Sequence, residues 1–274
     1  MLVTRFAPSP TGYLHRGHAF SALSAYAAAR AAGGRFLLRI EDIDVTRCRP
    51  AYETAIFEDL TWLGLTWETP VRRQSDHLAD YQAALKQLEA DGLLYRCFRT
   101  RKEVALAMTS APHGPLEVFR GGPLAEDQEA RRLAGGEPFA WRLSLDAAKR
   151  RLGGFDGLTF TDNGDGIAAQ PELGGDVILA RKDVGVAYHL AVVVDDALQA
   201  VDAVIRGRDL FEATHVHRLL QTLLDLPTPA YRHHSLFLDP EGRRLAKRDG
   251  APTLRSLRER GMSAASLRRD LGFG

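Results

Sequence analysis

The sequence predicts an α/β fold with a parallel sheet, a smaller inserted subdomain and a short helical C-terminal segment. The first observation is that a strand over 2–6, a helix over 14–32 and the almost continuous apolar strand "RFLLRIED" follow one another. This order is typical of a right-handed βαβ unit, and an uninterrupted apolar strand is typical of a buried parallel sheet. The second observation is that glycine, proline and charged residues accumulate between about 100 and 139. Such a composition interrupts the α/β pattern and predicts an insertion.

The other elements follow in chain order. Apolar residues recur at helical spacing over 51–64 and 77–91, whereas "APHGPLEVFRGG" and "FDGLTFTDNGDG" predict turns and short strands rather than helices. We predict strands in "GDVILARKD", "YHLAVVVDDAL", "VDAVIRGRDL" and "HHSLFLDP", and helices over about 214–224 and 263–271. The expected division is a catalytic domain over 1–95 and 171–250, an inserted α+β subdomain over 96–170, and a C-terminal helical segment over 251–274.

Composition restricts the class of protein. The 36 basic and 35 acidic residues nearly balance, which does not indicate a polycation that wraps nucleic acid. Only two cysteines occur, too few for a disulfide framework, so we expect a reducing compartment. The N-terminus lacks a signal-peptide pattern and no apolar run approaches the roughly 20 residues of a membrane span. We therefore predict a cytoplasmic protein with no membrane association.

The predicted start of the first helix carries two histidines around a glycine, in His15-Arg16-Gly17-His18. A helix N-terminus offers unpaired N–H groups and a partial positive charge, which favour a phosphate. Imidazoles add hydrogen-bond donors, and Gly17 lets a flat ligand such as a purine approach the backbone. Alternatively, the two histidines have surface or capping roles.

A second candidate element is "RRLAKRDGA", which follows a strand-like segment and contains Lys247. A lysine in a short basic loop bounded by glycine suits a mobile cation that closes over a triphosphate. The alternative is a solvated run of charge.

Together these two elements resemble the HIGH and KMSKS signatures of class I aminoacyl-tRNA synthetases. The local forms are His15-Arg16-Gly17-His18 and Arg244-Leu245-Ala246-Lys247-Arg248, in the expected order. "RFAPSPTGYLHRGHA", "LLRIEDID", "YHLAVVVDDA" and "VIRGRDL" narrow the resemblance to the glutamyl branch, over nearly the whole chain. The resemblance implies a Rossmann-type (HUP-like) nucleotide-binding domain, and ATP with Mg²⁺ rather than an all-protein metal cage.

The chain resembles, more narrowly, the stand-alone paralogues of glutamyl-tRNA synthetase. It ends at "LRRDLGFG", where a glutamyl-tRNA synthetase continues into anticodon-reading domains, so we expect no anticodon-binding domain. These paralogues attach L-glutamate to queuosine in the anticodon loop of tRNA(Asp). The implied reaction forms glutamyl-adenylate from ATP and then transfers the glutamyl group to a queuosine hydroxyl. We expect a monomer.

The resemblance also implies site residues. For glutamate they are Arg5, Ser9, Glu41, Tyr188 and Arg206; the two arginines are candidates for the carboxylates, and Glu41 and Tyr188 surround the ammonium. For ATP they are Pro8, Gly12, His15, Gly17, His18 and Lys247, of which His15, His18 and Lys247 are the expected catalytic residues. Two alternatives stay open, namely that Glu41 belongs to a solvated acidic turn and that Arg206 forms a structural ion pair with Asp209.

Related proteins place a zinc site in the insertion, but here the ligands are incomplete. "YRCFRTRKEV" keeps Cys97 and has Arg99 where a second thiolate is expected, and "LEVFRGGPLAED" supplies no cysteine. A structural zinc needs about four ligands, so we predict no bound metal. We expect packing around Phe98, Phe119 and Trp141 instead, with His113 as an ordinary loop histidine.

Three other functions remain open at this point. One is an enzyme that passes an adenylate to a small molecule or carrier, another is glutamylation of a tRNA 3′ end, and the last is a catalytically silent RNA-binding paralogue. The glutamyl-type motifs disfavour the small-molecule or carrier enzyme, and the expected lack of an anticodon domain disfavours charging of a tRNA 3′ end. The retained His15, His18 and Lys247 disfavour the silent paralogue.

Overall fold

The computed structural model describes residues 1–109, 118–181, 185–236 and 252–274. Strands form a seven-stranded sheet in the order β3-β2-β1-β9-β10-β6-β7 and a three-stranded sheet in the order β4-β5-β8. The large sheet consists of β1 (Val3–Phe6), β2 (Arg35–Ile40), β3 (Arg72–Arg73), β6 (Thr159–Asp162), β7 (Asp165–Ala168), β9 (Ala203–Gly207) and β10 (Ala230–His234). All its pairings are parallel except that of β6 with β7.

The βαβ unit predicted at the N-terminus is confirmed. The helix α1 (Arg16–Ala31) connects β1 to β2, which pair in parallel from Val3 with Arg35 to Phe6 with Leu38. The β2 strand is buried from its second residue onward, as its continuous apolar sequence predicts. The predicted helices over 51–64 and 77–91 are α2 (Pro50–Trp62) and α3 (Leu78–Ala90).

The small sheet is antiparallel and consists of β4 (Leu94–Cys97), β5 (Ala140–Leu143) and β8 (Ile178–Arg181). Sheet membership differs from the expected division at two places. β8 belongs to the small sheet although we assigned residues from 171 onward to the catalytic domain, and the β6–β7 hairpin joins the large sheet although we assigned it to the insertion. Neither pairing is visible in the sequence, because each strand is short and its partner is distant along the chain.

The turn and short strands predicted in "FDGLTFTDNGDG" are confirmed by the β6–β7 hairpin, and most of "APHGPLEVFRGG" lies outside the described residues. The sequence analysis named no helix between 100 and 139, but two segments there form α4 (Arg101–Thr109) and α5 (Glu126–Ala134). No residue of α5 is buried, so the helix has no apolar stripe for the sequence to reveal. Acidic residues in its first turn, basic residues in its last turn and an ion pair between Asp127 and Arg131 stabilise it instead. A further helix, α6 (Leu145–Leu152), begins at the N-cap Ser144.

The strand predicted in "YHLAVVVDDAL" was also wrong. The segment forms α7 (Tyr188–Leu198), in which seven consecutive residues from Leu190 to Asp196 are buried. A helix that is buried on all sides has an unbroken apolar sequence, and so has a buried strand, so periodicity does not distinguish the two. The three valines favour a strand, which explains the wrong prediction. α7 packs against α3 and α8 (Phe211–Leu223).

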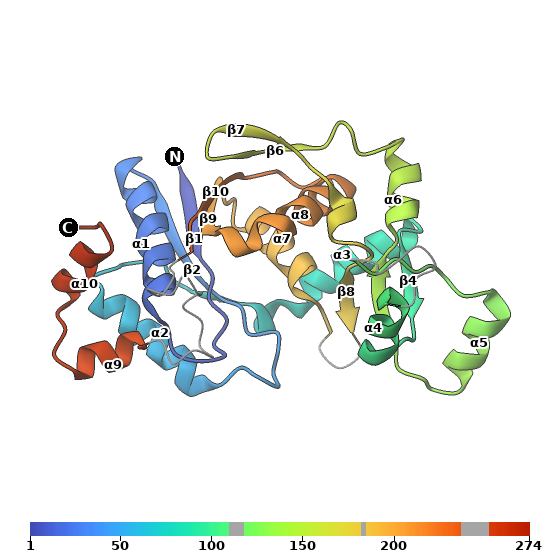
Figure 1. Cartoon of the computed structure of the whole chain (residues 1–274), viewed down its shortest axis with the longest axis horizontal. Coiled ribbons are helices and arrows are strands. Elements are labelled where there is room, and N and C mark those ends of the chain that lie inside the picture. Colours follow the sequence, from blue (N-terminus) through green and yellow to red (C-terminus); the bar gives the residue numbers. More distant parts are fainter. Residues whose placement is uncertain (110–117, 182–184, 237–251) are drawn as a thin grey trace.

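The predicted C-terminal helical stretch is present as α10 (Ala264–Asp270), preceded by α9 (Leu254–Glu259). Both begin at hydroxyl N-caps, Thr253 and Ser263. Figure 1 shows the two helices beside α1 and α2, on the side of the molecule away from the small sheet. Thr253 is held next to the start of α1, because Leu254 N donates to Leu14 O at 2.8 Å and His15 forms a β-bridge with Thr253.

No helix among the described residues is long and apolar enough to cross a membrane.

Candidate active site

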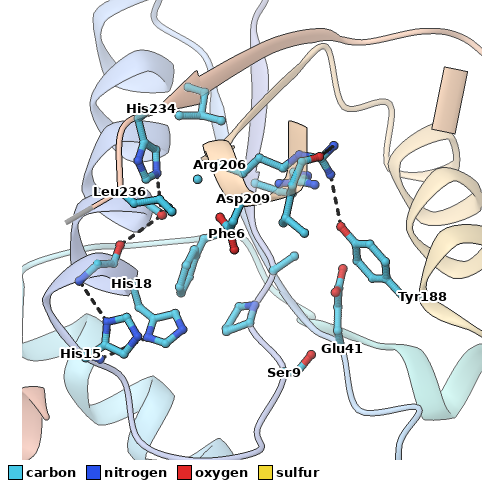
Figure 2. A pocket seen from close by; sticks show the side chains of 18 of the residues that line it. Phe6, Ser9, His15, His18, Glu41, Tyr188, Arg206, Asp209, His234 and Leu236 are labelled. Carbon is cyan, nitrogen blue, oxygen red and sulfur yellow. Dashed lines mark hydrogen bonds between the residues drawn. The ribbon is translucent and has the colours of Figure 1, made fainter. Parts of the chain in front are cut away.

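A cavity of about 420 Å³ opens at the carboxyl ends of β1, β2 and β9, next to the N-terminus of α1. Ligands of open α/β sheets bind at this edge, where strands hand over to helices. The cavity brings together nine of the eleven predicted site residues, namely Arg5, Pro8, Ser9, His15, Gly17, His18, Glu41, Tyr188 and Arg206. Gly12, buried in the turn after β1, does not line it, and Lys247 lies outside the described residues. Figure 2 shows the imidazoles on one side and Glu41, Tyr188 and Arg206 on the other.

The two predicted histidines cap α1 as well as line the cavity. His15 Nδ1 accepts a hydrogen bond from Gly17 N at 3.1 Å, and His18 Nδ1 accepts one from His15 N at 3.2 Å. The ring centroids lie 3.8 Å apart. A ring nitrogen that accepts a hydrogen bond carries no proton, so both neutral rings hold their proton on Nε2. Capping and ligand binding are therefore compatible roles for these residues.

The His15 ring packs closely against Gly17. A Cβ at position 17 would lie 3.0 Å from His15 Cε1 and 3.2 Å from Nδ1, closer than most side chains tolerate. The sequence analysis explained Gly17 only as a position where a flat ligand can approach the backbone. The structure adds that its missing side chain lets the His15 ring fold back onto the helix end.

Glu41 is buried, which contradicts the alternative of a solvated acidic turn. Its side chain is 8% exposed and accepts from Arg39 Nη2 at 3.1 Å. Burial raises the pKa of Glu41, and the charges of Arg39 and Arg5 counter only part of that shift. A ligand ammonium beside this carboxylate would favour its ionised form.

Arg5 lines the cavity but is paired with a buried aspartate. Its Nε lies 3.1 Å from Asp196 Oδ1 and its Nη2 lies 3.4 Å from Asp196 Oδ2. Burial alone would raise the pKa of Asp196, but the charges of Arg5 and Arg39 lower this pKa below its usual value. The remaining Arg5 N–H groups are available to an anion, but its charge is already balanced.

Arg206 is different, because it forms no salt bridge with the carboxylate of any described residue. Its side chain is buried and its partners are neutral, including His233 Nε2 at 3.1 Å, Tyr188 Oη at 3.2 Å and Thr214 Oγ1 at 2.7 Å. The alternative of an ion pair with Asp209 is therefore not seen. A buried cation is normally paired with an anion, so an uncompensated guanidinium at a cavity indicates an anionic ligand.

Sequence reasoning missed the ionic cluster beneath the cavity. Arg39 is wholly buried and reaches Asp196 Oδ1 at 2.8 Å and Asp195 Oδ2 at 3.5 Å. Asp195 also accepts from Arg72 Nε and Gln74 Nε2, each at 2.7 Å. The sequence signal that could have indicated this buried cluster is the pair of adjacent aspartates at the end of an apolar run, in "VVVDD".

Cavity-lining residues outside the prediction are Phe6, Ala7, Thr11, Ser21, Ile205, Gly207, Asp209, Leu210, His234 and Leu236. Of these, Ser21 Oγ lies 2.8 Å from His234 Nε2 and joins the first turns of α1 to the end of β10.

Comparisons with known proteins identify the family. The family model for the catalytic domain of class I tRNA synthetases (E and Q) matches residues 1–271 of this chain. A glutamyl-Q tRNA(Asp) synthetase of Rhodobacter capsulatus is 46% identical over 99% of this chain and 100% of its own length. Another, of Nocardia farcinica, is 45% identical over 94% of this chain and 80% of its own length. The chain belongs to the glutamyl-Q tRNA(Asp) synthetase family.

As a member of this family, the chain is a ligase of the aminoacyl-tRNA synthetase type, with a function in glutamate activation that is related to tRNA. The solved glutamate tRNA ligase of Elizabethkingia meningosepticum, in complex with its amino acid, superposes with a TM-score of 0.76. It is 28% identical and covers 91% of this chain, which spans 52% of that ligase. The expected Rossmann-type α/β fold is thereby confirmed.

Among the residues that the structure describes, no three His, Cys, Asp or Glu side chains are placed to hold a metal ion. Cys97 is 6% exposed and packs with Tyr95 and Phe119. Phe98 and Trp141 contact Phe139 edge-on or tilted, and Arg96 lies over the Trp141 ring at 4.3 Å. His113 lies outside the described residues.

Proposed function

We propose that this protein activates L-glutamate with ATP and transfers the glutamyl group to queuosine in the anticodon loop of tRNA(Asp). The observation that carries the proposal is the uncompensated Arg206 cation at one end of a cavity whose other end holds two imidazoles at a helix N-terminus. The queuosine acceptor is supported by two similar relatives, which are named glutamyl-Q tRNA(Asp) synthetases.

The glutamate end of the cavity suits an amino acid with two carboxylates. Arg206 supplies a net positive charge to one carboxylate, and the free Arg5 N–H groups supply donors to the other. Glu41 and Tyr188 Oη accept from the ammonium, and Ser9 lies exposed at the cavity edge. An amino acid with a neutral or cationic side chain brings only one carboxylate and would leave one of the two arginines without a ligand carboxylate.

The nucleotide end suits a triphosphate. Because the Nδ1 atoms of His15 and His18 accept hydrogen bonds at the start of α1, Nε2–H is the group with which each neutral ring can donate to a phosphate. These donors and the positive end of the helix favour phosphate oxygens. Lys247 is proposed to stabilise the departing pyrophosphate, and Mg²⁺ is proposed to arrive with ATP because the metal prefers substrate phosphates to protein cages.

The chemistry has two steps. A carboxylate oxygen of glutamate attacks the α-phosphorus of ATP, the bond to the bridging oxygen breaks, and pyrophosphate leaves with the electron pair. A queuosine hydroxyl then attacks the glutamyl carbonyl, loses its proton and forms an ester as AMP leaves. The protein contributes positioning and charge stabilisation, and no covalent enzyme intermediate forms.

ATP–pyrophosphate exchange tests the first step. We expect glutamate-dependent exchange without tRNA, and a sharp reduction in Lys247→Ala with the fold intact. No exchange in wild type under any condition would favour a silent RNA-binding paralogue. Unchanged exchange in Lys247→Ala would contradict the role given to that lysine.

Labelled glutamate tests the second step. The protein is incubated with ATP, labelled glutamate and tRNA(Asp) with or without queuosine, and nuclease digestion then locates the label. We expect label in the anticodon fragment of queuosine-containing tRNA only. Label at the 3′ end of the tRNA, or on a small molecule, would contradict queuosine as the acceptor and identify that group as the acceptor instead.

A further inference from the structure

A line of buried groups connects Arg206 to the β6–β7 hairpin. Asp162, the last residue of β6, accepts from His233 N at 3.0 Å and lies 2.9 Å from His233 Nδ1. On the other side of the same ring, His233 Nε2 accepts from Arg206 Nε at 3.1 Å. His233 Nε2 also lies 3.2 Å from Thr214 Oγ1, which is itself a partner of Arg206. The His233 side chain is fully buried, so these protein groups rather than water surround the ring nitrogens. The line therefore leads from a carboxylate on the hairpin to the guanidinium at the cavity.

The carboxylate fixes which nitrogen of His233 carries the proton. A carboxylate only accepts hydrogen bonds, so the ring donates from Nδ1 and leaves the Nε2 lone pair free. Arg206 only donates, so it requires that lone pair. Burial and the Arg206 charge lower the pKa of His233 to about 4, although Asp162 opposes the shift, and the ring stays neutral near pH 7.

The other Arg206 contacts fix the rest of the guanidinium. Nη2 donates to Leu210 O at 3.2 Å and Thr214 Oγ1 at 2.7 Å, and Nη1 donates to Tyr188 Oη at 3.2 Å. A guanidinium has five N–H groups, so four are committed. Among the described residues, the second Nη1 N–H has no partner. It is left for a ligand in the cavity.

We propose that Asp162 and His233 are positioning residues that orient Arg206 for the carboxylate of the substrate amino acid. The inference rests on the proposed function, and it extends the amino acid site to a hairpin that does not line the cavity. The hairpin turn is itself well defined, because Asn163 and Gly164 both have positive φ, as a two-residue turn of the Asn-Gly type requires. Asn163 N donates to Tyr231 O at 3.0 Å and fastens the turn to β10.

Equilibrium binding of glutamate and of ATP by calorimetry tests the inference in four variants. His233→Phe keeps a ring but removes the acceptor, and we expect glutamate Kd to rise at least tenfold with ATP Kd changed less than twofold. His233→Gln keeps an acceptor near the Nε2 position, and we expect glutamate Kd within about threefold of wild type. Asp162→Ala frees the His233 tautomer and is expected to raise glutamate Kd about fivefold.

His215→Phe is the matched control, since His215 is also a buried histidine of this core but accepts from Gln170 N at 3.0 Å and does not contact Arg206. We expect both Kd values to stay within twofold of wild type.

Unchanged glutamate Kd in folded His233→Phe, or equal weakening of glutamate and ATP, would overturn the inference. If His233→Phe does not fold, Asp162→Ala and His233→Gln decide by the same two Kd values. Wild type that binds glutamate without catalysing exchange would refute the proposed function and leave the positioning role measurable. Wild type that binds no glutamate would refute both.

Discussion

Arg39 and Asp196 form a salt bridge in the interior of the protein, with 2.8 Å between Nη1 and Oδ1 and no exposed surface on the Arg39 side chain. Arg39 also holds Glu41, so the ion pair connects the cavity to α7. Removing one partner of a buried ionic cluster leaves the others without a counter-charge.

Arg39→Met should therefore lower the free energy of unfolding by about 3–5 kcal/mol. The matched control is Arg35→Met on the same strand, because Arg35 pairs with Glu68 where both side chains are exposed. An exposed pair is weak, so the control should barely change stability. Urea denaturation at pH 7 measures both. Equal midpoints for the two variants would show that the buried cluster contributes no more than a surface pair.

The double role of His15 gives a second prediction. His15→Asn keeps a side-chain acceptor for the end of α1 but removes the Nε2–H donor, so ATP–pyrophosphate exchange should fall at least tenfold with stability nearly unchanged. His15→Ala removes both and should also lose about 1 kcal/mol, a typical N-cap contribution. Exchange assays and thermal unfolding of the two variants separate the roles. Full exchange in His15→Asn would mean that the ring serves the helix alone.

The absence of zinc is a third prediction. Arg99 stands in place of a thiolate, and Cys97 is packed against aromatic rings rather than exposed to a metal. Elemental analysis of the purified protein should find far less than one zinc per chain, and EDTA should leave the Tm unchanged. One zinc per chain, lost in Cys97→Ala, would contradict it.

The cavity residues could be named from the sequence because the motifs that carry them resemble those of class I aminoacyl-tRNA synthetases, and the strand order explains why they meet. Arg5 lies in β1, Ser9, His15 and His18 come after it, and Glu41 comes directly after β2, so parallel pairing of β1 and β2 brings them to one edge. The strand–helix–strand order and the continuous apolar second strand are typical of such parallel pairing.

The contacts beneath the cavity were not predictable, because they join residues far apart in sequence. Asp162 meets His233 across 71 positions, and Arg39 meets Asp196 across 157. The two aspartates of α7 follow an apolar run, and Asp162 comes directly before a turn whose sequence is typical of a surface hairpin. Only tertiary packing shows that these polar residues are buried.

The buried histidines give the last prediction, which concerns pH. Burial and the Arg206 charge lower the pKa of His189 to about 4, whereas an unfolded histidine has a pKa of about 6.5. Between these values the unfolded chain binds the proton and the folded protein does not. The stabilising contribution of neutral His189 is therefore complete above pH 6.5 and is lost as pH falls toward 4, by roughly 2 kcal/mol at pH 5. His189→Asn, whose side-chain oxygen can still accept from His217 Nε2, should flatten the fall in urea midpoint between pH 7 and pH 5. His77→Asn, at an exposed side chain, should follow the wild-type curve. Identical slopes for wild type and His189→Asn would show that His189 takes up its proton in the folded protein as readily as in the unfolded chain.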